Sequence, residues 1–130
     1  KFNEIGILTF TSTIWENQVS YALGLDSNDV VIAISNSGES SQVLAVCKEM
    51  KKRGVPTIGI TNNEDSVVAK ECVYHIQTST REKLFLNEFC FSRISAATII
   101  EILYLFLTNA SDNSYDRISQ CEELYASLKV

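Results

Sequence analysis

The 130-residue sequence has little of what several functional classes require. It has one histidine and no C-x-x-C pair, which disfavours a zinc site, and we expect neither a metal nor an organic cofactor. Its 11 lysines and arginines against 16 acids give a net charge of −5. These residues alone therefore do not suit nucleic-acid binding, because phosphate neutralisation requires clustered cations. The longest apolar stretch, residues 94–107, contains Glu101 and is too short to span a bilayer.

The cysteines lie far apart in the sequence, and three of them stand among apolar residues of predicted helices. They are Cys47, Cys72, Cys90 and Cys121. This spacing favours buried, reduced thiols over zinc or disulfides, which fits a reducing cytoplasm. Lys1 opens a segment without a signal-peptide pattern. With 45% hydrophobic and 21% charged residues, the chain is typical of one globular domain, and we expect a cytoplasmic protein without membrane contact.

The most informative stretch is an apolar run that ends in small hydroxyl residues around a glycine. Residues 30–34 do not alternate in polarity, which is typical of a parallel strand buried on both faces. Residues 39–53 predict a helix with an acid in its first turn, cations in its last turn and Gly54 just past its end. The turn between them lies at a helix N-terminus, where backbone N–H groups favour an anion.

The side chains of this turn suit a phosphate. From Ser35 to Ser41 it contains four serines, the Asn36 amide, and Gly38, which allows close backbone approach or a positive φ. It has no lysine and matches neither the P-loop nor the dinucleotide pattern, so nucleotide binding is disfavoured. The alternative is that one serine caps the following helix. Because the turn has more polar groups than a cap requires, we favour the anion site.

The remaining chain alternates strands and helices. Strands are predicted at residues 5–10, 55–63 and 73–77, and helices at residues 15–23, 65–70, 89–107 and 114–128. This alternation predicts a mainly parallel sheet, whose ligands bind outside the C-terminal strand ends. We expect Trp15, Val19, Ala22 and Leu23 to point inward. The helix at residues 89–107 is apolar on most sides, which predicts packing on the sheet and in a homodimer or higher oligomer.

Residues 31–40 (Val-Ile-Ala-Ile-Ser-Asn-Ser-Gly-Glu-Ser) resemble the strand and S-x-S-G-E-T loop of the SIS (sugar isomerase) domain, a phosphosugar-binding family. The resemblance implies a flavodoxin-like three-layer α/β/α sandwich that holds a sugar phosphate at this loop. We call residues Ser35–Ser40 the serine loop. By position, the implied ligand contacts are Ser35, Asn36, Ser37, Gly38 and Ser40. Ser40 stands where the family often has threonine, and it retains the hydroxyl.

Two further segments resemble the SIS domain of RpiR-type bacterial transcription regulators. They are Phe91–Ser95, at the start of the long apolar helix, and Asn113–Asp116, before the terminal helix. Those regulators join an N-terminal helix-turn-helix domain to this C-terminal sensor, so DNA contact is expected only through a domain outside these residues. The family also begins with a strand, a G-x-G-x-S-type loop and a helix before the counterpart of Ile5. We therefore expect residues 1–130 to be a single, N-terminally truncated SIS domain.

Three other polar residues are candidates for the site. His75 lies in a predicted buried strand, where a lone histidine is more often a satisfied core or rim residue than a catalyst. Glu88 has three interpretations: an acid at a helix N-terminus, a ligand of sugar hydroxyls, or the carboxylate that moves a proton in an isomerase. Arg93 is suited either to a phosphate or to pairing with Glu88 or Glu101.

Three functions remain open. In the first, the domain senses a phosphorylated sugar or amino sugar and shifts its dimer between two arrangements. In the second, it is a phosphosugar isomerase or lyase with Glu88 as base and His75 for ring opening. In the third, it is a dimerisation module with a vestigial site. The sequence favours the sensor, because a proton-shuttle constellation is not evident around His75 and Glu88 and the terminal helix resembles the regulators.

Overall fold

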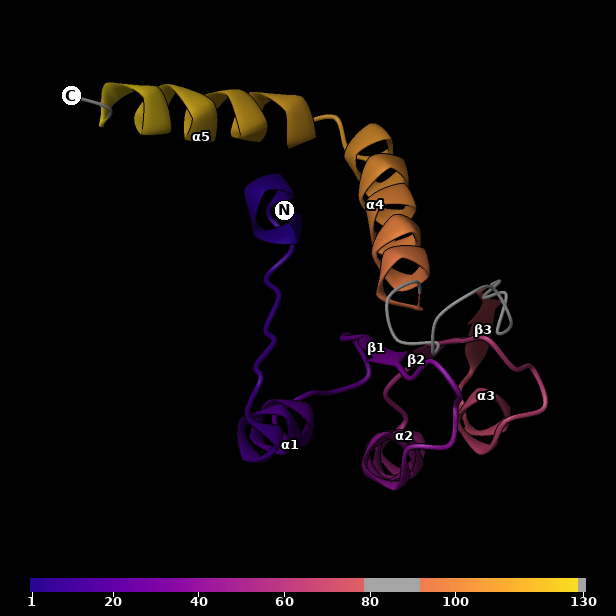
Figure 1. Cartoon of the computed structure of the whole chain (residues 1–130). Helices are drawn as coiled ribbons and strands as arrows, with labels where there is room; N and C mark the ends of the chain where they lie inside the picture. Colours follow the sequence, from indigo (N-terminus) through magenta and orange to yellow (C-terminus); the bar gives the residue numbers. More distant parts are fainter. Residues whose placement is uncertain (79–91, 129–130) are drawn as a thin grey trace. The chain divides into compact units, whose positions relative to one another are not determined.

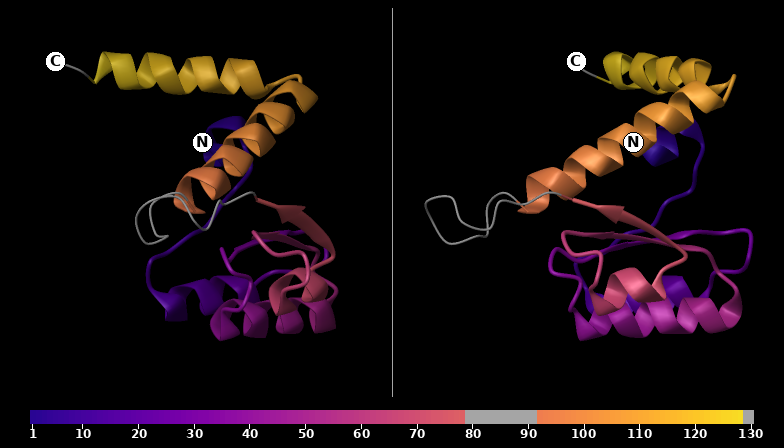
Figure 2. Two further views of the ribbon diagram at one scale, coloured as in Figure 1. Left: turned by 45° about the vertical axis from the view of Figure 1, so that its right-hand side comes forward. Right: turned by 90° about the vertical axis from the view of Figure 1, so that its right-hand side faces the viewer.

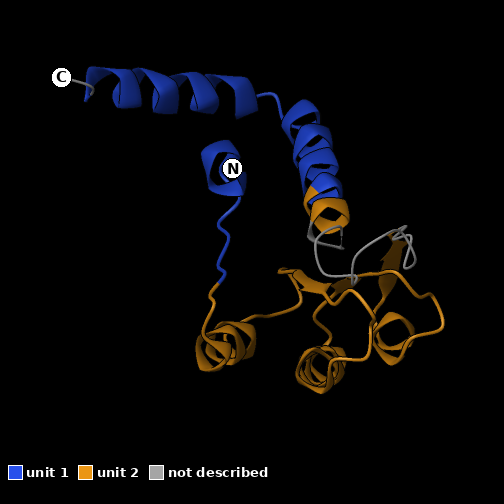
Figure 3. Ribbon diagram, viewed as in Figure 1, with its two compact units in different colours: residues 1–11, 98–130 blue, residues 12–97 orange. Residues whose placement is uncertain are grey.

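The computed structural model describes residues 1–78 and 92–128. It divides into two compact units, one of residues 12–97 and the other of residues 1–11 with 98–130 (Figure 3). Glu88 and the predicted start of the long helix at Phe89 lie outside the described residues. Each unit is described by itself below.

The unit of residues 12–97 is built on a parallel three-stranded sheet, as predicted (Figure 1). Its strands are β1 (Val31–Ile34), β2 (Thr57–Thr61) and β3 (Tyr74–Gln77), in the order β1-β2-β3. In this register Ala33 is opposite Gly59, and Gly59 is opposite His75. The C-terminal ends of all three strands therefore meet at one edge of the sheet.

Three helices lie on the same face of this sheet (Figure 2). They are α1 (Trp15–Leu23), α2 (Ser41–Arg53) and α3 (Val67–Glu71). One buried cluster joins Ala22, Met50 and Val55, and a second joins Ala33, Cys47 and Val68. Each fully buried aliphatic or thioether side chain contributes about 1.5–3 kcal/mol relative to exposure, so these clusters hold the helices on the sheet.

Helix α2 begins later than the sequence indicated. Ser40 is its N-cap, so Glu39 precedes the helix, and the predicted acid in the first turn is wrong. The other end agrees with the prediction, because Lys51, Lys52 and Arg53 occupy the last turn and Gly54 adopts the left-handed conformation with φ 73°.

The prediction that residues 30–34 are a strand buried on both faces is wrong at the two ends of that range, of which Val30 precedes β1 and Ile34 ends it. Val30 is 51% exposed and Ile34 is 47% exposed. Helices α1, α2 and α3 cover the face that carries Ala33, and Ile34 lies on the opposite face. Leu23, expected to point inward, is also exposed because it ends α1 beside Gly24.

The predicted strand over residues 5–10 is wrong. The chain forms a 3-10 helix, η1 (Phe2–Ile5), and residues 7–10 belong to no described helix or strand. A strand requires a neighbour for its ladder of hydrogen bonds. Here the Ile7 N–H donates to the Phe2 carbonyl at 3.0 Å, and the Thr9 N–H donates to Asn3 Oδ1 at 2.8 Å. These local hydrogen bonds take the place of the ladder that a strand would form with a neighbour.

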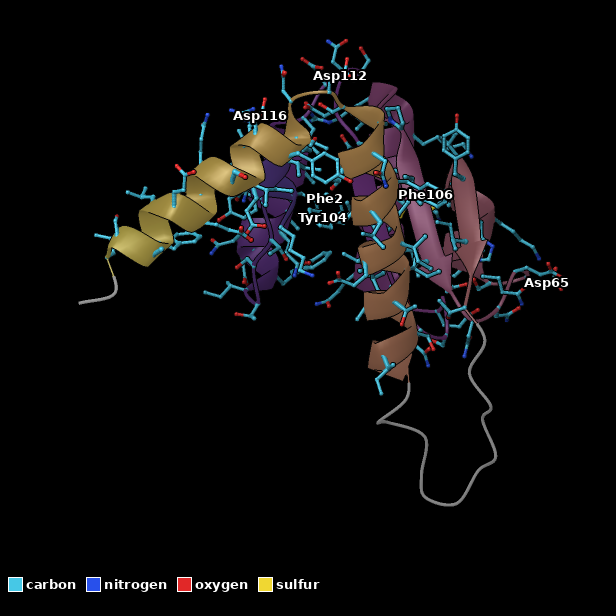
Figure 4. All side chains as sticks on the ribbon, turned by 90° about the horizontal axis from the view of Figure 1, so that it is seen from above. Phe2, Asp65, Tyr104, Phe106, Asp112 and Asp116 are labelled. Atoms are coloured by element: carbon cyan, nitrogen blue, oxygen red, sulfur yellow. The ribbon has the colours of Figure 1, made fainter. Side chains whose placement is uncertain are left out.

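The other unit contains η1, most of α4 (Ser92–Ala110) and α5 (Ser114–Ser127). Its aromatic contact joins Phe2 to Tyr104, with ring centroids 6.2 Å apart at 75° (Figure 4). The Lys1 ammonium pairs with Glu101 and lies 5.5 Å from the centre of the Tyr104 ring. Phe106 is on the side of α4 away from Phe2 and is 71% exposed.

In the described ranges, no single helix is both long and apolar enough to cross a membrane. Only the pair Ile94–Ala110 and Ser114–Ser127, bent by 111°, reaches those limits together, by length and composition.

Candidate functional site

The serine loop continues the sheet beyond the end of β1. The Ser35 N–H donates to the Ile60 carbonyl at 3.1 Å, which extends the β1–β2 ladder by one residue. The Asn62 N–H then donates to the Asn36 carbonyl at 2.7 Å. Ser35 is nearly buried, whereas the side chains of Asn36 and Ser37 are exposed. The loop is thus held by its backbone and presents polar side chains outward.

Gly38 makes the turn of the serine loop possible. Its N–H donates to the Ser35 carbonyl at 3.0 Å, and its φ is +72°, a conformation that favours glycine. A Cβ on Gly38 would lie 2.0 Å from Ser66 Oγ and 2.3 Å from Ser66 Cβ. The predicted positive φ is therefore confirmed, and the close approach that Gly38 allows is to the start of α3.

Helix α3 supports the serine loop through a hydrogen bond to its backbone. The Val68 N–H donates to the Gly38 carbonyl at 3.0 Å, and Ser66, the N-cap of α3, accepts the Ala69 N–H at 3.3 Å. Ser66 and Val68 are almost completely buried. This contact between α3 and the serine loop was not predicted, although Ser66 stands directly before an apolar run and such a serine is an N-cap signal that could have located the start of α3.

The two outer hydroxyls of the loop already accept backbone protons. Ser40 Oγ caps α2 by accepting the Val43 N–H at 3.4 Å, and Ser37 Oγ accepts the Glu39 N–H at 3.3 Å. Capping, the alternative raised for these serines, is therefore present at Ser40. It does not compete with anion binding, because a hydroxyl that accepts a proton still has its own proton to donate.

The loop has the chemistry of an anion site. The first N–H groups of α2 have no acceptor within the helix, and the dipole of this helix places partial positive charge at that end. Asn36, Ser37 and Ser40 add neutral donors beside it. A hydrogen bond to a charged group stabilises binding by about 1.5–3 kcal/mol, so several such donors could hold a phosphate without a lysine.

The structure brings five predicted site residues together in one turn at the strand ends: Ser35, Asn36, Ser37, Gly38 and Ser40. Glu88 lies outside the described residues, so its relation to this turn stays a prediction. Arg93 is in the first turn of α4, and its side chain is also outside the described part of the chain.

His75 is engaged by a neighbouring strand. Its Nε2 lies 2.8 Å from Thr61 Oγ1, and Thr61 is completely buried. The Thr61 hydroxyl donates its single proton to the Asn63 carbonyl at 2.8 Å. We therefore assign the His75 proton to Nε2, which donates to Thr61. In this tautomer Nε2 is a donor rather than a base.

Within residues 1–78 and 92–128, no three histidine, cysteine or acidic side chains come together to hold a metal ion. Cys47, Cys72 and Cys121 are free thiols, and Cys90 lies outside these ranges.

The family model described as SIS domain matches residues 1–106. An uncharacterized HTH-type transcriptional regulator from Caldanaerobacter subterraneus is 28% identical over 131 residues, which cover all of this chain and 46% of the regulator. The arabinose 5-phosphate isomerase KdsD of Escherichia coli is 48% identical over 48 residues, which cover 37% of this chain and 15% of the isomerase. The chain thus spans less than half the length of these curated relatives.

Two solved structures share the fold. The Vibrio vulnificus NanR protein complexed with ManNAc-6P superposes with a TM-score of 0.85 at 18% identity, over 99% of this chain and 49% of that protein. The sugar isomerase domain of an RpiR transcription factor from Sphaerobacter thermophilus gives 0.72 at 17% identity, over 94% and 67%. The predicted α/β fold and the resemblance to RpiR-type regulators are confirmed. The family match and the shared fold agree, and the chain belongs to the SIS domain family.

Proposed function

We propose that this chain is the phosphosugar-binding effector domain of an RpiR-type transcription regulator. The observation that supports the proposal is the serine loop, a polar turn at the strand ends and at the start of α2 that is held by Asn62 on one side and Val68 on the other. HTH-type regulators among the relatives support the regulatory part, and DNA would be contacted through a helix-turn-helix domain outside these residues.

In this proposal the phosphate lies over the start of α2. Its oxygens accept protons from the first N–H groups of the helix and from the hydroxyls of Ser37 and Ser40, while the Asn36 amide donates from the side. Ser35 and Gly38 determine the path of the loop backbone, and neither residue contributes a side-chain contact to the charged phosphate in this proposal. The ligand is a phosphorylated sugar or amino sugar, in line with the ManNAc-6P bound by the NanR protein of the same fold.

An effector must favour one arrangement of the protein over another to transmit a signal. We propose that the arrangements are those of a homodimer or higher oligomer. Large apolar side chains are exposed on both helices of the second unit: Ile102, Leu105, Phe106, Tyr115, Leu124, Tyr125 and Leu128. Such surfaces are typical of protein interfaces. We place the protein in the cytoplasm, where such a regulator meets both its sugar phosphate and DNA.

The second candidate is a phosphosugar isomerase, favoured by the locally high identity to KdsD. It requires a base to move a proton between adjacent carbons, and Glu88 is the candidate for that role. His75 Nε2 is engaged as a donor to Thr61, so ring opening by His75 would have to use Nδ1. We expect binding without turnover.

The test is a thermal-shift screen of the purified chain against sugar phosphates, amino-sugar phosphates and inorganic phosphate, with NMR of each hit over time. Selective stabilisation without chemical change would support the effector domain. Conversion of a hit to an isomer would instead establish the enzyme. Stabilisation by none of these compounds would overturn both candidates.

A matched pair of serine variants locates the site. Ser37→Ala removes a hydroxyl of the serine loop, and Ser20→Ala removes an exposed hydroxyl of α1 that only bonds to its own helix. We expect Ser37→Ala to weaken sugar-phosphate binding and Ser20→Ala to leave it unchanged. Equal affinities for both variants would exclude the serine loop.

A further inference from the structure

Two free thiols meet behind the serine loop. Cys47 of α2 and Cys72, the residue directly after α3, have their sulfur atoms 3.6 Å apart although they are separated by 25 positions in sequence. Cys47 is completely buried, and Cys72 is partly exposed. Neither belongs to the anion site, and among the described residues no third ligand joins them to hold a metal.

The sheet leaves space for this pair. Gly59 of β2 lies directly under Cys72, and a Cβ at Gly59 would be 2.9 Å from the Cys72 sulfur and 3.3 Å from Cys72 Cβ. Thr57, two residues earlier on the same strand, is completely buried and accepts the Val73 N–H at 3.1 Å. The backbone directly after Cys72 is thus bonded to β2, the Cys72 N–H itself donates to the Val68 carbonyl at 3.2 Å, and the Cys72 sulfur lies against Cys47.

The two thiols differ in acidity. A hydrogen bond from Cys47 is the main cause that lowers the pKa of Cys72 to about 7, a hydrogen bond from Thr57 adds to it, and burial opposes both. The same contact with Cys72, followed by burial, raises the pKa of Cys47. Near neutral pH a substantial fraction of Cys72 is therefore thiolate, which makes Cys72 the nucleophile, while Cys47 keeps its proton.

We propose that Cys47 and Cys72 form a peroxide-sensitive thiol pair that closes to a disulfide. The Cys72 thiolate attacks one oxygen of hydrogen peroxide, the O–O bond breaks, and the departing hydroxide takes a proton to become water. This leaves a sulfenic acid on Cys72. The Cys47 sulfur then attacks the Cys72 sulfur, and the S–O bond breaks as the hydroxyl leaves with the Cys47 proton as water. Both thiols are oxidised, and one peroxide is reduced to two waters.

Closure of the disulfide acts on the supports of the serine loop. The sulfur separation must fall from 3.6 Å to about 2.05 Å, which draws α3 and α2 together. Helix α2 begins directly after Ser40, and Val68 of α3 bonds to the Gly38 carbonyl. We therefore expect oxidation to change the affinity of the loop for its anion. This consequence rests on the proposed function, whereas formation of the disulfide does not depend on it.

The test uses the full chain with Cys90→Ser and Cys121→Ser, so that only the proposed pair remains. Hydrogen peroxide is added in small molar excess, and peptides are mapped without reduction. We expect a Cys47–Cys72 cross-link that dithiothreitol reverses, forming faster as the pH rises from about 6 to about 8 because more Cys72 is thiolate. Sulfinic acid on Cys72 without a cross-link, or thiols that stay reduced, would overturn the proposal.

Cys47→Ala in the same background removes the second thiol. This variant also loses the hydrogen bond that lowers the pKa of Cys72, so we expect Cys72 to be oxidised more slowly than in the parent. At about pH 9, where an ordinary thiol is largely ionised, we expect oxidation to stop at the sulfenic acid, which dimedone traps, without an intramolecular disulfide. Failure of the trap at a folded Cys47→Ala protein would also contradict the mechanism, and if that variant does not fold, peptide mapping of the parent decides. A cross-link in a chain that binds no sugar phosphate would support the thiol pair and reject the proposed function, so the two failures are distinguishable.

Discussion

Replacement of Gly38 by alanine tests the central feature of the site, the contact between the serine loop and α3. Two costs add at this position. An L-residue in the left-handed conformation that Gly38 adopts, φ +72°, costs about 1–2 kcal/mol. The new methyl group would also lie 2.0 Å from Ser66 Oγ and 2.3 Å from Ser66 Cβ, and such overpacking costs about 1–3 kcal/mol. The expected loss in free energy of unfolding is about 2–5 kcal/mol.

Gly54 provides the matched control. Its φ is +73°, nearly that of Gly38, but a Cβ there would meet nothing within 4 Å. Gly54→Ala therefore carries only the backbone cost of about 1–2 kcal/mol. The difference between the two variants measures the contact with Ser66.

The assay is urea unfolding followed by circular dichroism, with the sugar-phosphate affinity measured on the folded fraction. We expect Gly38→Ala to lose clearly more stability than Gly54→Ala, and to bind the phosphate more weakly because the loop is displaced from α3. Equal losses of stability in the two variants would refute the reasoning, since they would show that the serine loop does not press against Ser66.

Four further outcomes are expected. Ser40→Ala should lower the free energy of unfolding by about 1 kcal/mol through loss of the α2 cap, and also weaken phosphate binding; an affinity equal to the parent's would limit Ser40 to capping. Met50→Ala should cost about 2–5 kcal/mol in urea unfolding, because Met50 is completely buried, and leave the affinity of the folded protein unchanged. Phe106→Glu should shift sedimentation toward the monomer, and an unchanged sedimentation coefficient would exclude that part of α4 from the interface. Thr61→Val should free His75 Nε2, which NMR of the imidazole would detect as a change of tautomer or of the Nε2 chemical shift; an unchanged spectrum would contradict the assigned hydrogen bond.

The part of the fold that the sequence predicted best is the segment from β1 to Gly54. Its signals are local and independent: a β-branched run, a polar turn with glycine, and a helix with cations and glycine at its end. Each element could be located without knowledge of its neighbours. The candidate site lies within this segment, so its position at the strand end was predictable.

The failures occurred where the structure of a segment depends on its neighbours. Residues 7–10 have the composition of a strand, but they bond to Phe2 and Asn3 instead of a strand partner. The exposure of the Ile34 side chain could not be inferred either, because an apolar run does not indicate which face of the strand the helices cover.

Contacts between residues far apart in the sequence could not be predicted from local sequence patterns either. The approach of Ser66 to Gly38 and the bond between Thr61 and His75 join residues of different elements. The contact of Cys47 with Cys72 also depends on the packing of α2 beside α3. The prediction of buried thiols holds for Cys47 but not for the partly exposed Cys72 and Cys121, and the pairing of Cys47 with Cys72 was not predicted.

Because the serine loop is attached to the sheet, the phosphate and the sugar ring of a bound effector would have different roles. Because Ser35 and Asn36 are fixed in register against β2, we expect the phosphate end of the proposed site to change little on binding and to have similar affinity in any arrangement of the subunits. A group that binds two states equally contributes affinity but does not shift their populations. The phosphate would therefore hold the effector in place, and the discrimination that switches the protein would come from the sugar ring.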